Sequence, residues 1–529
     1  MFRNVMYYGD FDVAGFYPKD IPAENLTHLN YAFLDFDADG NLHWMNEHYA
    51  VDSPGGESDV VVGSASAGLI NAFQELRLRH PNLLIGISVG GWTKSGDFAP
   101  AAANPVARGR LVANLIKFVE YNELDFLDID WEYPGAVRSP DAADPSDEGT
   151  QGTFADYANY VTLLQELRSG LAALSAKTGK TYELSIAVFA GEWVDGEGNS
   201  GSAYIKPIFD TIDFGNIMTY DMAGSWVPVT MHHTATTANP LAPERAQRSV
   251  AGTIDYYLAN GAPAAKLDVG VAFYTRGWGG VADDGPMAGS LPGLYTDNGG
   301  APADGMAGIW PYRRLPELIA QYGNDAAGSP NLKRYWDAAA LAPYLYSASD
   351  KVLYSYDDAE SITAKTAYVK AHNLGGIITW MMSQDAEVAP DSGIRRELTD
   401  AITNGLYPAG YALPKYDRPT AKLNITASLI AGSQGTELSI QNNEVLVETD
   451  QVLKQVEAKH KTLKSPHLTI TPAQSAAKGF DLAEIAPGQT VIVPLGPNLS
   501  PSDIREIAIE QRIANIPYGR QTIYPTAVQ

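Results

Sequence analysis

The sequence contains no cysteine among its 529 residues. This absence excludes disulfide bonds, thiol catalysis and zinc sites built from thiolates. No apolar run approaches the ~20 residues that a membrane-spanning helix needs. The first residues, Met1 to Asn4, lead directly into a strand-like run and contain none of the charged and apolar regions of a secretory signal. We therefore expect a globular chain without a membrane span.

Basic residues are also few. Lys and Arg number 37 against 62 Asp and Glu, which gives a net charge of -25. A surface of this sign repels phosphate backbones and anionic lipids, so neither a nucleic acid nor a membrane is expected as a partner. Hydrophobic residues make up 45% of the chain. The length is sufficient for one large domain and one smaller domain.

The most informative stretch is LDFLDIDWEYP, Leu124 to Pro134. In an extended strand, Asp128, Asp130 and Glu132 would share one face, because successive side chains point to opposite sides. Like charges this close cannot all ionise readily, so at least one acid is expected to keep a proton near neutral pH, as a general acid must. By itself, the pattern leaves catalysis and divalent-metal binding equally open.

The stretch resembles the active-site strand of the family 18 glycoside hydrolases, the chitinases, whose pattern is D-G-x-D-x-D-W-E. The sequence from Asp125 to Glu132 matches it except at Phe126, where the family usually has glycine. Phe126 would lie one layer below the acids, so a neighbouring strand must leave it room. The resemblance implies a TIM (β/α)8 barrel that needs no metal and no organic cofactor.

Seven further apolar runs have the spacing of barrel strands. With the acidic strand, they predict an eight-stranded barrel, its other strands at residues 4–8, 27–33, 83–89, 182–189, 214–221, 267–273 and 376–380. Helical periodicity predicts a helix from Phe154 to Leu174. His28 lies among apolar residues and is interpreted as a core histidine. The acidic loop from Asp141 to Glu148 is expected to be solvated.

Three more motifs resemble those of the family. Ser88 begins a sequence similar to S-x-G-G, Met218 to Asp221 matches M-x-Y-D, and Phe273 to Arg276 is similar to F-Y-G-R, with threonine in place of glycine. Trp380 ends the eighth expected strand, where the family places a tryptophan.

The resemblance implies the following catalytic roles. Glu132 protonates the leaving oxygen and then activates water. Asp130 orients the 2-acetamido group of the sugar and stabilises the oxazolinium ion, while Asp128 holds a proton shared with Asp130. Tyr220 hydrogen-bonds the acetamido carbonyl, which attacks the anomeric carbon.

Substrate binding is assigned to a second group of residues. Ser88 is expected to hydrogen-bond a carboxylate of the acid row. Asp221, paired with Arg276, would contact the reacting sugar, and Trp380 would form the floor beneath it. The other expected substrate-binding residues are Tyr274, Trp92, Trp226, Met218 and Phe33; for Phe33, a packing role and a sugar contact are equally weighted.

The expected domains are a catalytic barrel over residues 1–410, with an α+β insertion at about 278–352, and a C-terminal domain over 411–529. The insertion includes a helix-like stretch at 312–322. Strand-like runs at 423–430, 437–440, 445–447, 468–470 and 490–493 predict a β-sandwich-like C-terminal domain. All nine tryptophans lie at or before Trp380, so this domain lacks the usual platform for chitin. A structural role or a protein partner is expected for it instead.

The resemblance thus implies a chitinase that hydrolyses β-1,4 N-acetylglucosamine linkages in chitin and its oligosaccharides with retention, acting extracellularly without a visible signal peptide. One alternative is an endo-N-acetylglucosaminidase acting on N-glycans. A chitin lectin would lack the acid, but Glu132 is present. A chitin-binding subunit of a larger, toxin-type assembly is also compatible with the sequence.

Overall fold

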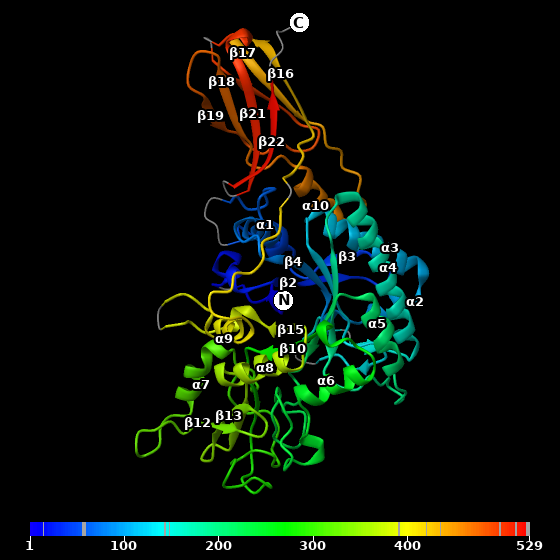
Figure 1. Ribbon diagram of the computed structural model, residues 1–529, viewed down its shortest axis with the longest axis vertical. Helices are drawn as coiled ribbons and strands as arrows, with labels where there is room; N and C mark the ends of the chain where they lie inside the picture. The colour runs from blue at the N-terminus through cyan, green and yellow to red at the C-terminus, as the bar shows by residue number, and fades with distance from the viewer. Residues whose placement is uncertain are drawn as a thin grey trace.

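The computed structural model describes residues 1–13, 15–55, 60–141, 144–147, 149–389, 392–418, 420–433, 435–496, 499–513 and 516–524. Figure 1 shows the barrel in the middle of the molecule, with the C-terminal domain at one end and the insertion, containing α7, β12 and β13, at the other.

Eight parallel strands form the barrel in the order β1-β15-β10-β9-β8-β5-β4-β2, and the pairing of β2 with β1 closes it. The strands are β1 Arg3–Gly9, β2 His28–Phe36, β4 Leu84–Gly90, β5 Phe126–Asp130, β8 Glu183–Phe189, β9 Phe214–Met218, β10 Leu267–Ala272 and β15 Gly376–Trp380. Short β3 (Leu42–Trp44) pairs antiparallel with the end of β2. The predicted fold class is confirmed, because each of the eight apolar runs became a barrel strand.

Helices surround the barrel and bury the outward-facing apolar residues of the strands. They are α1 Leu69–Arg79, α2 Phe98–Ala103, α3 Pro105–Tyr121, α4 Ala155–Thr178, α5 Ile205–Thr211, α6 Val250–Ala259, α8 Ala359–Ala371 and α9 Glu397–Leu406. The predicted helix at 154–174 corresponds to α4. None of the helices among the described residues is long and apolar enough to cross a membrane.

The insertion after β10 is built on a four-stranded antiparallel sheet in the order β11-β14-β13-β12. Its strands are β11 Arg276–Trp278, β12 Lys333–Asp337, β13 Ala342–Ser347 and β14 Val352–Ser355, and its helix is α7 Leu315–Gln321. The sheet packs its own cluster of buried residues, which includes Trp278 and Tyr344. Two-residue strands β6 (Val137–Arg138) and β7 (Thr150–Gln151) pair in the loop after β5.

The C-terminal domain contains two antiparallel sheets, β16-β17-β20 and β19-β18-β21-β22, around one apolar core. The strands are β16 Ile425–Gly432, β17 Gly435–Asn442, β18 His467–Pro472, β19 Lys478–Asp481, β20 Thr490–Pro494, β21 Ile504–Ile513 and β22 Ile516–Ile523. This is the predicted sandwich-like architecture.

One predicted strand of this domain is wrong. Residues 445–447 form no strand, and a helix that was not predicted, α10 (Gln451–Lys461), follows them. The Val445 carbonyl accepts a hydrogen bond from Lys461 Nζ at 2.8 Å, and Val447 N donates to Glu457 Oε1 at 3.0 Å. Side chains of α10 therefore satisfy backbone groups that would otherwise pair with a neighbouring strand.

Helix α10 attaches the C-terminal domain to the barrel. Its apolar residues Val452, Leu453 and Val456 are part of the main barrel core. Asp450 caps the start of the helix by accepting a hydrogen bond from Leu453 N at 3.0 Å, and it accepts another from Leu42 N of β3 at 2.9 Å. The composition of the C-terminal sequence did not indicate this docking role.

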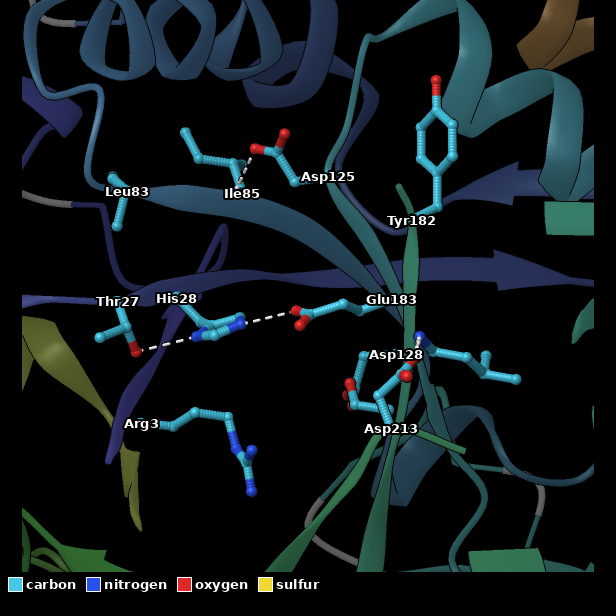
Figure 2. A network of polar contacts seen from close by, with 12 residues as sticks. Arg3, Thr27, His28, Leu83, Ile85, Asp125, Asp128, Tyr182, Glu183 and Asp213 are labelled. Atoms are coloured by element: carbon cyan, nitrogen blue, oxygen red, sulfur yellow. Dashed lines mark hydrogen bonds and ion pairs between the residues drawn. The ribbon is translucent and has the colours of Figure 1, made fainter. Parts of the chain in front are cut away.

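Figure 2 shows a polar network at the amino-terminal end of the barrel. The ring of His28 contacts Thr27 Oγ1 through Nδ1 and Glu183 Oε2 through Nε2, each at 2.8 Å. His28 is thus the buried, hydrogen-bonded core histidine that the sequence predicts.

Candidate active site

The acid row lies at the carboxyl end of β5. Asp128 and Asp130 belong to the strand, and Glu132 is the second residue beyond its end. Trp131, between the last two acids, is buried among the surrounding helices. Alternation along the strand therefore separates an inward acidic face from an outward apolar face, as the sequence predicts.

Phe126 lies below the acids, and Gly86 on β4 makes room for it. The two residues are in register. A Cβ atom at Gly86 would come within 2.4 Å of the Phe126 ring. The large residue in place of the family's glycine is thus accommodated by a glycine on the neighbouring strand.

Asp128 is completely buried and accepts four hydrogen bonds from four different strands. The donors are Tyr7 OH at 2.8 Å, Ser88 Oγ at 2.7 Å, Ser185 Oγ at 2.5 Å and Asn216 Nδ2 at 3.2 Å. Burial raises the pKa of Asp128, and the hydrogen bonds lower it in part. Ser88 therefore lies where it was expected, bonded to a carboxylate of the row.

Asp130 lies in a different environment. It is 3% exposed, and its Oδ1 atom has no hydrogen-bond partner among the described residues. Burial, followed by the charges of Glu132 and Asp128, raises its pKa well above the ordinary value. Asp128 has four donors and Asp130 has none at Oδ1 among the described residues, so we infer that a proton shared by these two acids resides mainly on Asp130.

Glu132 has the pKa of a general acid. Burial raises it to about 7; a hydrogen bond with Tyr133 and the charge of Arg138 oppose the shift, and the charge of Asp221 adds to it. Its backbone N donates to the buried Ser95 Oγ at 2.7 Å, and Ser95 in turn donates to the Gly91 carbonyl at 2.9 Å. These two hydrogen bonds connect the loop after β4 to the backbone of Glu132.

Asp221, in the loop after β9, and Arg276, at the start of β11, form the predicted pair. Arg276 Nε and Nη2 donate to the two carboxylate oxygens at 2.6 and 2.7 Å. Burial alone would raise the pKa of Asp221, but the guanidinium outweighs it and holds the pKa below its usual range. Tyr220 and Tyr274 pack beside them, edge to face, with ring centroids 6.3 Å apart.

Aromatic residues form the floor. Phe33 stacks on Trp380 at 5.7 Å with an interplanar angle of 20°, and Phe11 stacks on it at 6.1 Å. Phe33 is only 7% exposed, so packing beneath the mouth is its main observed role. Met218 is half-buried and packs in the same cluster as Tyr220 and Trp380.

Two exposed tryptophans flank the mouth, each held by an arginine. Arg138 lies 4.0 Å from the ring centre of Trp92 and donates to its carbonyl at 2.7 Å. Arg276 lies 5.1 Å from the ring centre of Trp226. Trp92 is 42% exposed and Trp226 is 58% exposed. Both rings are therefore oriented and open to solvent, as stacking on a sugar requires.

Asp147 departs from the expectation of a solvated acidic loop. It is 5% exposed and binds the Arg138 guanidinium through both oxygens. Residues 142–143 and 148 of the same loop lie outside the described residues. The buried acid fixes the arginine that holds Trp92.

Sequence reasoning missed several polar residues of the site. Tyr7, Ser185 and Asn216 all donate to Asp128, and Ser95 holds the backbone of Glu132. For Tyr7, Ser185 and Asn216 a signal was present: each is a polar residue inside an apolar strand. Ser95 lies in a loop, where serine is common and carries no such signal.

Comparisons with known proteins identify similar sequences. The model of the glycosyl hydrolases family 18 matches residues 3–385. Chitinase A1 of Niallia circulans is 32% identical over 463 residues, covering 77% of this chain and 60% of that protein. Chitinase B of Serratia marcescens is 27% identical over 413 residues, covering 69% of this chain and 74% of that protein.

Solved structures are also similar. Chitinase ChiA74 from Bacillus thuringiensis superposes with a TM-score of 0.67 at 25% identity, covering 99% of this chain and 84% of its own. A family 18 N-acetylglucosaminidase from Paenibacillus barengoltzii gives a TM-score of 0.58 at 26% identity, covering 77% of this chain and 100% of its own.

Proposed function

The chain belongs to the glycosyl hydrolases family 18, and we propose that it is a chitinase that hydrolyses β-1,4 linkages between N-acetylglucosamine units. The observation that carries the proposal is Glu132, a half-buried acid with a pKa raised to about 7 at the barrel mouth. A carboxyl group with this pKa is protonated in a large fraction of molecules near neutral pH, so it can protonate a glycosidic oxygen.

We infer that the reaction retains the anomeric configuration through assistance by the substrate. In this respect, family 18 is an exception to the two-carboxylate mechanism of most glycoside hydrolases. The carbonyl oxygen of the 2-acetamido group attacks the anomeric carbon while Glu132 transfers its proton to the leaving oxygen. Glu132, now a carboxylate, takes a proton from the water that opens the oxazolinium ion and so returns to its starting form. The electron pair of the broken glycosidic bond stays with the leaving sugar.

Asp130 assists this step as the partner of the acetamido group. Its Oδ1 has no partner among the described residues, and its proton is held by burial and by two neighbouring acids. A substrate amide entering the site would supply a hydrogen-bond partner for this carboxyl group. Transfer of the proton to Asp128, as positive charge develops on the oxazolinium ion, leaves Asp130 as a carboxylate that stabilises the ion, while Tyr220 orients the acetamido carbonyl.

Sugar binding follows from the residues around the mouth. The Asp221–Arg276 pair presents a charged, hydrogen-bonding edge, and Trp380 presents an apolar face for the sugar ring. Ser88 acts indirectly, because it holds Asp128, while Tyr274 and Met218 pack against the reacting sugar. Trp92 and Trp226 supply stacking faces further out. On these assignments, we propose chitin and its oligosaccharides as the substrates.

A second candidate is an N-acetylglucosaminidase. The similar structure from Paenibacillus barengoltzii carries that name. The two exposed tryptophans flanking the mouth favour a longer chain of sugars instead, because each offers a stacking face beyond the central floor. The presence of Glu132 weighs against a lectin. We also propose extracellular action, because chitin is a polymer too large to enter a cell.

The test is the product pattern from the chitin hexamer at early times, with the anomer ratio read by proton NMR. Fresh β-anomer products would support retention with assistance from the substrate. Mostly α-anomer products would refute that mechanism. Release of monomers alone would favour the N-acetylglucosaminidase function.

A further inference from the structure

A cavity of about 490 Å³ lies between the barrel and the C-terminal domain. Its walls include residues of α1, the end of α3, the start of β16 and the end of α10. Figure 1 shows α1 and α10 on the side of the barrel that faces the sandwich. Asn122 and Glu123, which line it, precede β5, whereas Glu132 follows β5. The cavity therefore lies toward the opposite end of the barrel from the acid row.

The charge of this cavity is the reverse of that of the chain. Six lysines and one histidine line it, against three glutamates. In the whole sequence, acids outnumber Lys and Arg by 62 to 37. Basic residues are thus concentrated here in a protein that has few of them.

Half of these lysines already have carboxylate partners. Lys117 binds Glu448 at 2.7 Å, Lys177 binds Glu120 at 2.5 Å and Lys461 binds Glu457 at 2.8 Å; these are ordinary surface or intrahelical pairs. Such pairs leave little charge available for a ligand.

Lys464 is different. It is 8% exposed, and its Nζ donates to Asn71 Oδ1 of α1 at 2.7 Å, a neutral acceptor. Among the described residues it has no carboxylate within ion-pair distance. Burial lowers its pKa to about 8; Glu123 and Glu484 oppose the shift, and Lys459 adds to it. A buried ammonium without a counter-charge is costly, and a bound anion would remove that cost.

Lys459 and Lys422 contribute to the same field. Lys459 Nζ donates to the Ser64 carbonyl at 2.6 Å, and no carboxylate of the described part of the chain pairs with it. Lys422 reaches the cavity from the exposed segment before β16. Glu123 and Glu444 also line the cavity and repel an anion, but the lysines without a carboxylate partner outnumber them.

We propose that this cavity binds a small multivalent oxyanion, carrying phosphate or several carboxylates, with Lys464 as its main ligand. Because Asn71 comes from the barrel and Lys464 from the C-terminal domain, the bound anion would hold the two parts together. The site is separate from the proposed chitinase site, so its occupation stabilises the protein without entering the reaction.

The test uses the full chain at pH 7, with pyrophosphate and citrate as probes and sodium chloride at matched ionic strength as the reference. Binding is measured by titration calorimetry, and stability by the melting temperature. Wild type should bind one of the probes, and its melting temperature should rise with probe concentration. K464M should bind about tenfold or more weakly, the scale of one lost charge-assisted hydrogen bond. The probe that binds more tightly distinguishes phosphate from carboxylate recognition.

The matched control is K478M, because Lys478 lies in exposed β19, away from the cavity. It should keep the wild-type affinity, and K464M should keep the wild-type rate on the chitin hexamer. The proposal is overturned if wild type binds neither probe or if K464M binds as tightly as K478M. Should K464M fail to fold, K422M removes a lysine from an exposed part of the wall, and an unchanged affinity in K422M would overturn the proposal.

Discussion

Arg418 Nη1 donates a hydrogen bond to Asp125 Oδ1 over 2.7 Å. Asp125 is the first acid of the stretch that carries Asp128, Asp130 and Glu132, and it immediately precedes β5. Arg418 belongs to the segment between the last barrel helix and the sandwich. The chain that leaves the barrel therefore returns to brace the base of the strand that carries the acid row.

Replacing this arginine should destabilise the barrel. R418M removes one of the three cations near Asp125, the others being Arg77 and Lys180. Because those two cations remain, we expect the free energy of unfolding to fall by about 1–3 kcal/mol, which is less than the full cost of breaking a buried ion pair. Urea unfolding at pH 7 measures it. R505M, which replaces an exposed arginine, is the control, and an unfolding midpoint of R418M equal to that of R505M would refute the bracing role.

Glu132→Gln should abolish most of the turnover and keep substrate binding. The amide has the size of the acid but cannot transfer a proton, so kcat on the chitin hexamer should fall by about 10²–10⁴-fold. Binding of the hexamer, followed by calorimetry, should stay close to wild type. The exposed Glu244 supplies the control, E244Q. Near-native kcat in E132Q would show that another group is the acid.

The pH profile should report the same group. Because Glu132 acts as an acid and its pKa is about 7, kcat/KM should fall as pH rises above 7. This descending limb should be measured with the neutral chitin hexamer, which does not itself titrate. An activity that keeps rising from pH 7 to pH 9 would contradict the assignment.

Stability should depend on pH through the same proton. The native pKa of Glu132 lies above its unfolded value of 4.5, so protonation stabilises the folded state fully below about pH 4.5. This contribution is lost as pH rises through about 7. E132Q has no such proton, so its free energy of unfolding should not fall in this way. Relative to wild type, the free energy of unfolding of E132Q should rise by about 1–3 kcal/mol between pH 4.5 and pH 8. Equal pH dependence in the two proteins, measured by urea unfolding, would refute the raised pKa.

The Asp221–Arg276 pair should be sensitive to loss of its two-point geometry. R276K keeps the charge but loses the fork that reaches both carboxylate oxygens. We expect kcat/KM to fall by about 10–100-fold, on the scale of one charge-assisted hydrogen bond. R334K is the control, because Arg334 of β12 in the insertion pairs with Asp358, the N-cap residue of α8. Equal kcat/KM values for R276K and R334K would show that the Asp221–Arg276 pair does not contribute to the substrate site.

Gly86 and Phe126 should behave as a coupled pair. A methyl group at Gly86 would lie 2.4 Å from the ring, so G86A should destabilise the barrel by about 1–3 kcal/mol through overpacking. Adding F126A removes the ring, so the double mutant should lose less stability than the sum of the single mutants. Simple additivity in urea unfolding would show that the two positions are independent.

Local sequence patterns and motifs predicted the barrel strands of this protein and several contacts of its candidate site. The alternation from Asp125 to Glu132 indicated a strand with its acids on one face, and eight apolar runs became the eight barrel strands. The Asp221–Arg276 pair and the bond from Ser88 to the acid row were also found where they were expected. The alternation and the apolar runs are local patterns that can be read without the fold. The pair and the Ser88 bond were implied by the resemblance of their motifs to those of the family.

Other features depended on contacts between distant parts of the chain. The proton inferred on Asp130 follows from the four donors that converge on Asp128 from four strands, which no single segment contains. The sequence predicts a strand at 445–447 and does not indicate helix α10, because apolar residues can be buried either by a strand partner or by the barrel surface. The brace from Arg418 and the cavity at Lys464 likewise join residues hundreds of positions apart. Hydrogen bonding and desolvation act through space, so only the tertiary structure determined these features.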